Sequence, residues 1–272
     1  MLLPSTFFPD PGLEKYILSY GILEVADGIT ETFLSPPLGI SAFIIQHPVS
    51  TGTSAAIVNG EDLLINKAAA TGQVTATVTG YHTGKIKTLL VFFRPLGMYQ
   101  LFGCDMSRLT NTSVDLKEFL GAEKGMNLVS KLGQTEDDIS LISILNDFFS
   151  TQNQVSYNTS DLKRVLDFIH HNNGNVSIKE IEKSCYVHRK SIERHFQLKI
   201  GITPKIYSSI FRFKCLMNYL EQNPKTTWHE LSNRTGYYDQ SHMARYFKEY
   251  LKVSPNQLVT LDVAFINYLL SR

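Results

Sequence analysis

The 272-residue sequence has little of what marks secreted, membrane-spanning or metal-binding proteins. Its three cysteines are widely spaced and form no CxxC pair, which argues against a disulfide framework and a cysteine zinc site. Its longest apolar runs, such as residues 89–93, are far shorter than the ~20 residues of a membrane span. The first residues lack the basic start and long apolar stretch of a secretory signal. We therefore expect a soluble, cytoplasmic protein with no membrane association.

Charged residues make up 19% of the chain and are unevenly distributed. Residues 1–150 hold 9 Lys and Arg against 15 Asp and Glu, a net charge of −6. Residues 151–272 hold 17 against 10, a net charge of +7. The length allows two domains, and this asymmetry predicts an acidic domain joined to a basic one. The basic domain then faces either a polyanion or the acidic domain itself.

Short segments rich in β-branched and aromatic residues predict strands in the first 95 residues, at 40–45, 74–79 and 89–93. Their spacing favours a small antiparallel β-barrel or sandwich. Helical periodicity begins near Met98, and residues 136–149 place their apolar side chains largely on one stripe. We expect a β domain over residues 1–150 that ends in connector helices (about 98–150). A polar linker follows at residues 151–154.

The region after the linker contains an internal repeat. One copy runs from Ser177 to Pro204 and the other from Thr227 to Pro255, and each opens with an S/T-x-x-E capping box. A short helix, a tight turn and a second helix follow in each copy, which is typical of a helix-turn-helix. Residues 205–222 between them predict a helix of roughly 27 Å. Such a rod would place the two second helices in successive major grooves, ~34 Å apart. Two purely structural hairpins are the alternative.

These residues resemble the AraC/XylS family of bacterial transcription regulators over about residues 157–258. The second copy matches at Gly236-Tyr237, residues 239–242, residues 245–248 and Val253-Ser254-Pro255. The first copy matches at Ile192, Arg194, Phe196, residues 201–204 and Arg212. The first copy departs from the family at Cys185 and Tyr186, in a turn that usually holds a small residue or glycine. It departs again at His188, where a serine usually caps the second helix.

The resemblance implies an α+β chain. Residues 93–103 and 115–116 look like the junction at which a cupin-like β domain gives way to a helical connector in a subgroup of the family. Residues 151–272 would form an all-α domain of two helix-turn-helix units joined by a long helix. The implied function is sequence-specific regulation of transcription on double-stranded promoter DNA, as activator or repressor. The N-terminal domain would bind a small-molecule effector, form a homodimer, or both, and RNA polymerase is a further implied partner.

The second helix of each copy holds the residues expected to read DNA bases. They are Arg189, Lys190, Glu193 and Arg194 in the first copy, and Gln240, Ser241, His242 and Arg245 in the second. Arg and Lys can bond guanine, Gln adenine and Glu cytosine, although the basic residues can hold phosphate instead. The residues expected to contact phosphate are Lys199, Lys205, Lys248 and Lys252.

Other residues of the repeat have expected structural roles. Asp239 is placed to cap the second unit's second helix, and Trp228 to pack near the start of that unit. Four apolar residues are expected to hold the two helices of each unit together: Ile192, Phe196, Met243 and Phe247. The tail at residues 259–272 can cover the DNA-binding core, dock on the β domain or join two chains.

No catalytic residue, cofactor or metal is expected. The β domain has only His47 and His82, far apart and without a His-x-His motif, which argues against a cupin-type enzyme fused to a DNA-binding domain. Cys104 is the only cysteine before the linker, so alkylation repair through a cysteine-bound zinc has no site. A degenerate family member acting as a protein-interaction module is the remaining alternative.

Overall fold

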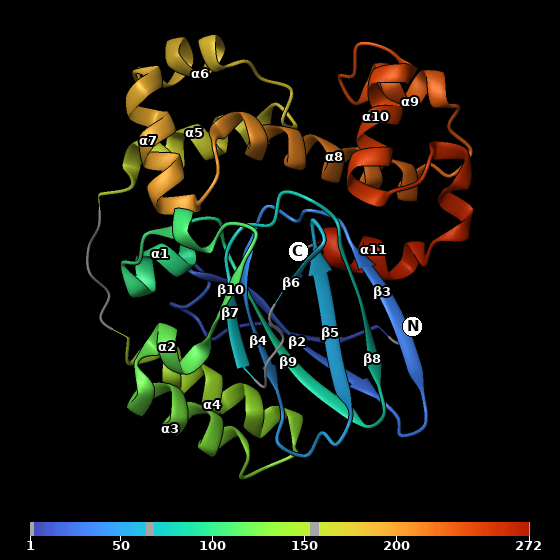
Figure 1. The fold of residues 1–272 in the computed structure, drawn as a ribbon. Coiled ribbons are helices and arrows are strands. Elements are labelled where there is room, and N and C mark those ends of the chain that lie inside the picture. The colour runs from blue at the N-terminus through green and yellow to red at the C-terminus, as the bar shows by residue number, and fades with distance from the viewer. Residues whose placement is uncertain (1–2, 64–67, 153–157, 272) are drawn as a thin grey trace.

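The computed structural model describes residues 3–63, 68–152 and 158–271 (Figure 1). Two antiparallel sheets form an N-terminal β-sandwich, as predicted. The first sheet has the order β1 (Ser5–Phe7), β2 (Ile17–Val25), β9 (Ile86–Phe93), β4 (Ser41–Gln46), β7 (Ala68–Thr71) and β10 (Ser113–Asp115). The second has the order β3 (Thr30–Ser35), β8 (Val78–Thr83), β5 (Thr53–Val58) and β6 (Glu61–Leu63).

Strand β9 shows why the apolar run at its centre is continuous. Successive side chains of a strand point to opposite faces, and both faces of β9 are covered. Leu89, Val91 and Phe93 pack into the core shared with the connector helices. Leu90 and Phe92 point instead between the two sheets, where they line a cavity. The centre of β9 is therefore apolar on both faces.

The connector helices cover the outer face of the first sheet (Figure 1). They are α1 (Gly97–Phe102), the 3₁₀ helix η1 (Met106–Leu109), α2 (Leu116–Leu120), α3 (Ala122–Leu132) and α4 (Asp138–Ser150). Lys87 of β9, which is 7% exposed, joins the start of α4 to the sheet. Its Nζ lies 2.7 Å from Asp138 Oδ1 and 2.9 Å from Glu24 Oε1. Burial lowers the pKa of Lys87, but these two carboxylates outweigh burial and leave the pKa raised.

The predicted strand at residues 74–79 is wrong for residues 74–77, whereas residues 78 and 79 belong to β8. Strand β7 ends at Thr71 and β8 begins at Val78, and a loop joins them. The loop meets other parts of the chain: Thr75 N donates to Asn111 Oδ1 at 2.8 Å, and Thr77 Oγ1 donates to the Glu249 carbonyl at 3.1 Å. A loop in which every second side chain contacts another segment shows the same alternation of polar and apolar residues as a strand. Of the predicted linker, residues 153 and 154 lie outside the described part of the chain.

The C-terminal region is helical, as predicted. Its elements are α5 (Ser160–His171), α6 (Ile178–Cys185), α7 (Arg189–Ile200), α8 (Pro204–Gln222), α9 (Trp228–Arg234), α10 (Gln240–Leu251), the 3₁₀ helix η2 (Pro255–Thr260) and α11 (Val263–Leu270). Both expected capping boxes are formed, at the starts of α6 and α9. The four expected packing residues are at most 1% exposed and lie in one core with α8. Trp228 packs edge-on against Phe247, as expected.

The second helix-turn-helix unit contacts α8 and the loop that follows α5. Gly236, in the turn of the second unit, has a φ of +73°, and a Cβ there would lie 2.6 Å from the Asn175 side chain. Arg212 of α8 donates to the Gly236 carbonyl at 3.2 Å and lies over the rings of Tyr237 and Tyr246. These contacts fix how the second unit is oriented relative to α8 and the loop before α6.

Within the described residues, no helix combines the length and the apolar character needed to cross a membrane.

Candidate nucleic-acid interface

Helix α7 is the second helix of the first unit, and its cap differs from the usual one. His188 occupies the N-cap position, but its side chain makes no capping hydrogen bond. Glu182 of α6 replaces it, because its Oε1 accepts a hydrogen bond of 2.7 Å from the Arg189 amide. A carboxylate at this end also interacts favourably with the helix dipole. The start of α7 is therefore fixed by Glu182, although His188 replaces the serine that usually caps this helix.

The base-reading residues predicted on α7 lie on its open side. Arg189, Lys190 and Arg194 are exposed and Glu193 is partly exposed. Arg189 Nε pairs with Glu193 Oε1 at 2.9 Å. The i,i+4 spacing of these two residues places their side chains together on the helix surface. Arg194 contacts the neighbouring His195 through a long 3.4 Å interaction.

Helix α10 is the second helix of the second unit. Asp239 caps it as expected, since its Oδ1 accepts a hydrogen bond of 2.7 Å from the His242 amide. Gln240, Ser241 and Arg245 are exposed. His242 is partly buried, and its ring packs edge-on against Tyr237 and Tyr246. The structure thus places three predicted base readers freely on the surface and one partly within the packing of the unit.

The predicted phosphate contacts divide into two groups. Lys205, Lys248 and Lys252 are exposed near the ends of α8 and α10. Lys199 points toward the connector, where its Nζ donates to the Asn158 carbonyl at 2.8 Å and lies 5.4 Å from the centre of the Tyr99 ring. Burial lowers its pKa. Lys199 is therefore part of the contact between the domains, and in this arrangement it is turned away from the open face of α7.

Both recognition helices touch the N-terminal domain with their C-terminal ends. At the end of α7, Thr110 Oγ1 donates to the Gly201 carbonyl at 2.6 Å. Near the end of α10, Thr77 Oγ1 donates to the Glu249 carbonyl. The N-terminal halves of the two helices project away from the β domain (Figure 1). Helix-turn-helix proteins use this half to contact base edges, so the β domain leaves the reading half open.

Two exposed tyrosines adjoin these helices and were missed by the sequence reasoning. Tyr186 and Tyr238 are both 89% exposed, one in the turn of each unit. Tyr186 follows α6 and Tyr238 precedes the cap of α10. A phenol in this place can donate a hydrogen bond to a phosphate. The signal was present in the sequence, because a large aromatic residue stands in both turns.

Replacing Tyr186 by glycine is expected to raise the free energy of unfolding by about 1 kcal/mol, because Tyr186 has a φ of 52° in the left-handed region. Tyr238 provides a matched control, since it is equally exposed and is not among the described residues with positive φ. Tyr238→Gly is expected to leave stability unchanged or lower it. Urea denaturation of both variants measures the difference, and an equal response at the two positions would contradict the assignment.

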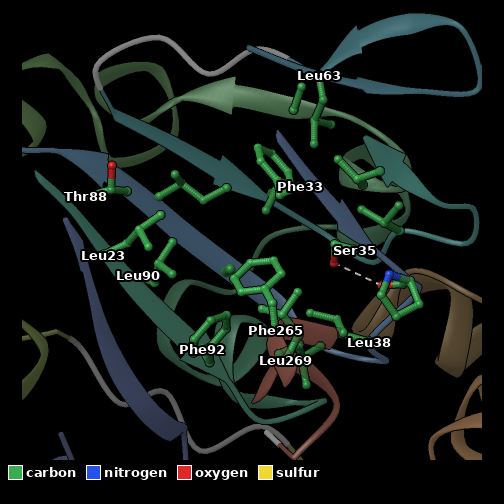
Figure 2. A pocket seen from close by; sticks show the side chains of 18 of the residues that line it. Leu23, Phe33, Ser35, Leu38, Leu63, Thr88, Leu90, Phe92, Phe265 and Leu269 are labelled. Carbon is green, nitrogen blue, oxygen red and sulfur yellow. Dashed lines mark hydrogen bonds between the residues drawn. The ribbon is translucent and has the colours of Figure 1, made fainter. Parts of the chain in front are cut away.

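A cavity of about 150 Å³ lies between the two sheets of the β domain (Figure 2). Its wall is mostly aliphatic and aromatic, with Leu23, Leu63 and Leu90 among its residues. His82 provides a polar group: its Nδ1 lies 2.8 Å from Ser54 Oγ, and its ring stacks on Phe33. Burial lowers the pKa of His82, so the ring is neutral near pH 7. No pattern in the sequence indicates this cavity.

The other histidine of the β domain has a different environment. His47 Nε2 lies 2.9 Å from the carbonyl oxygens of both Leu132 and Thr135, at the contact with the connector. In the described part of the chain, no group of three or more His, Cys, Asp or Glu side chains is arranged as a metal site.

Two capped recognition helices on one core, each with an exposed polar half, define a DNA-binding transcription regulator with a tandem helix-turn-helix domain. Residues 183–260 match the family described as "Helix-turn-helix domain". This match bears out the resemblance over the C-terminal part of the chain, where it identifies a helix-turn-helix domain. Residues 5–115 match a family described as a domain of unknown function (DUF6597).

Solved structures give low-identity matches. ToxT from Vibrio cholerae is 12% identical with a TM-score of 0.48, and the alignment covers 89% of this chain and 98% of ToxT. ToxT bound to (E)-4-(8-methylnaphthalen-1-yl)but-3-enoic acid is 11% identical with a TM-score of 0.46, covering 92% and 98%. The AraC-like transcriptional activator CuxR is 14% identical with a TM-score of 0.34, covering 80% and 88%. No curated protein matches the chain.

Proposed function

We propose that the protein binds one specific duplex site with both units, α7 and α10 entering successive major grooves. The observation that carries this proposal is the shared orientation of the two helices toward the β domain. Each touches that domain at its C-terminal end and exposes its N-terminal half. The bases are then read by the eight predicted residues: Arg189, Lys190, Glu193, Arg194, Gln240, Ser241, His242 and Arg245.

Phosphate contacts in this proposal come from Lys205, Lys248 and Lys252, with Tyr186 and Tyr238 added on the evidence of their exposure. Lys199 joins them only if the domains separate. The protein acts in the cytoplasm on promoter DNA, and RNA polymerase and a second copy of the chain are further partners. The cavity between the sheets is the candidate site for a small-molecule effector that controls DNA binding.

The affinity for duplex DNA is expected to fall steeply with salt, because lysines and arginines that neutralise phosphates release counterions. With about six phosphate contacts, log K should fall against log[salt] with a slope of about −5, or roughly a thousandfold between 50 and 200 mM. Fluorescence anisotropy with a labelled duplex measures the slope. A flat plot would remove DNA as the partner and leave the protein-interaction module as the function.

This proposal contains no catalytic step. The rival with an alkyl-acceptor cysteine needs a thiolate, and burial raises the pKa of Cys104 to about 11. Cys104 Sγ contacts Met106 Sδ at 3.4 Å, so its surroundings are apolar. The thiol is therefore a poor nucleophile at neutral pH, and the separation of His47 from His82 gives a cupin enzyme no ligand cluster.

A further inference from the structure

We infer that the effector cavity is assembled from both domains: helix α11 forms part of its wall, and the cavity takes a small, neutral, mostly apolar molecule of one or two rings. The inference rests on the proposed function, because it names the ligand class and the transmitting element of the effector site. Figure 2 shows Phe265 and Leu269 of α11 reaching the cavity beside Phe92 and Leu38. The β domain alone therefore leaves this part of the wall open.

Helix α11 contributes to two cores through two faces. Phe265 and Leu269, four residues apart and each 6% exposed, pack with Phe92 of the β domain. Ile266 and Leu270, also four residues apart and at most 1% exposed, belong to the core of the helix-turn-helix units. The same short helix thus touches the cavity and the DNA-binding core. A change in the position of α11 therefore changes both the cavity wall and the packing of the DNA-binding core.

One buried polar atom of α11 lacks a hydrogen bond in the docked position. Asn267 is 7% exposed, and its Oδ1 is buried without a hydrogen-bond partner among the described residues. Burying an unpaired polar atom lowers the stability of the docked position, because the atom loses its hydrogen bonds to water. This cost is present only while α11 is docked, and a ligand that contacts Phe265 and Leu269 adds to the contacts that favour docking.

The size and chemistry of the cavity define the ligand class. Its volume of about 150 Å³ matches that of apolar cavities that hold one benzene-sized molecule. None of the described lining residues carries a charge at neutral pH, so a buried carboxylate would be unpaired and costly there. The polar side chains of the lining are Ser35, Thr71, His82 and Thr88. The hydroxyls of Ser35 and Thr71 already donate to backbone carbonyls, which leaves Thr88 and His82 as the polar side chains for a ligand. We therefore expect a neutral molecule with one hydrogen-bonding group.

A ligand of this size fits while α11 is docked, so it binds and stabilises the docked arrangement. The affinity for DNA then changes to the extent that the docked and undocked states differ in DNA affinity. The coupling between the cavity and the DNA-binding core passes from Phe265 and Leu269 on one face of α11 to Ile266 and Leu270 on the adjoining face. No displacement within the helix-turn-helix units is needed.

Indole is a suitable probe, because it is neutral, fits this volume and carries one N–H donor. Isothermal titration of the full chain is expected to give one site with a dissociation constant of about 0.1–1 mM. Leu269→Trp fills the cavity and should weaken indole binding at least tenfold. Ala264→Trp adds the same ring at an exposed position of the same helix and should bind indole as the wild type does.

Two further measurements keep the test decisive if Leu269→Trp folds poorly. Leu269→Ala should enlarge the cavity and shift its preference from indole toward the larger 2-naphthol. Indole-3-acetate should bind the wild type at least tenfold more weakly than indole. Equal binding of indole by Leu269→Trp and the wild type, or no change in preference in Leu269→Ala, would show that α11 is not part of the wall. Equal binding of the acid would overturn the neutral class.

The effect on DNA is measured separately. Saturating indole should change the affinity of the wild type and of Ala264→Trp for DNA, but not that of Leu269→Trp. Indole binding that leaves DNA affinity unchanged would overturn α11 as the transmitter while leaving the cavity intact. If the wild-type protein binds indole but does not bind duplex DNA either with or without indole, the proposed function is contradicted.

Discussion

Replacing both Arg194 and Arg245 by alanine is expected to reduce affinity for the specific site by the product of two single losses. Each single replacement should cost ~1–3 kcal/mol, or roughly 5–150-fold, if the guanidinium bonds a base edge. The two residues lie in different units and share no partner, so their effects should add in free energy. Anisotropy titrations on a duplex selected from a random pool measure all four proteins of the cycle.

Arg234→Ala is the matched control. Arg234 is an exposed arginine in the last turn of α9, outside the recognition helix. The first helix of a helix-turn-helix crosses the DNA backbone. Removing the Arg234 side chain should therefore weaken binding to specific and to random DNA equally. Arg194→Ala and Arg245→Ala should weaken the specific site more than random DNA. If both behave like Arg234→Ala, they hold phosphate. A double variant no weaker than the worse single variant would mean that only one unit reads DNA.

The tandem units were predictable because their signals are local and occur twice. A capping box, a turn and an apolar 3-4 spacing each concern residues within one or two turns of helix. The same local logic placed the Asp239 cap and the burial of Phe196 and Phe247 correctly. It also exposed the unusual cap at His188, although the replacement by Glu182 depends on how α6 and α7 pack.

The failures share a different cause, which is contact between segments distant in sequence. Residues 74–77 alternate because one side of a loop meets Asn111 and Glu249. Lys199 looks like any lysine near a recognition helix until the connector is placed beside it. The cavity and the two faces of α11 need the β domain and the tail together, and no spacing within either one predicts them.

Phe213→Ala is expected to lower the free energy of unfolding of the helix-turn-helix domain by about 3–5 kcal/mol, the usual cost of removing a buried phenyl ring. Phe213 is fully buried at the middle of α8. Its ring lies 5.5 Å from that of Phe247 and 5.2 Å from that of Tyr250, so it joins the long helix to α10. Urea denaturation followed by helical circular dichroism measures the loss. Phe211→Ala, at a half-buried position where the ring stacks on His170, should cost less.

The same variant tests whether α8 sets the distance between the two reading helices. Wild-type protein should bind best to one spacing of its two half-sites and lose affinity when two base pairs are inserted between them, because the insertion rotates one groove away from its helix. Phe213→Ala loosens the joint between α8 and α10, so its binding should depend less on that insertion at a temperature where the domain remains folded. An unchanged spacing preference would assign the distance to the contacts at Gly236 and Asn175 instead of the packing of Phe213.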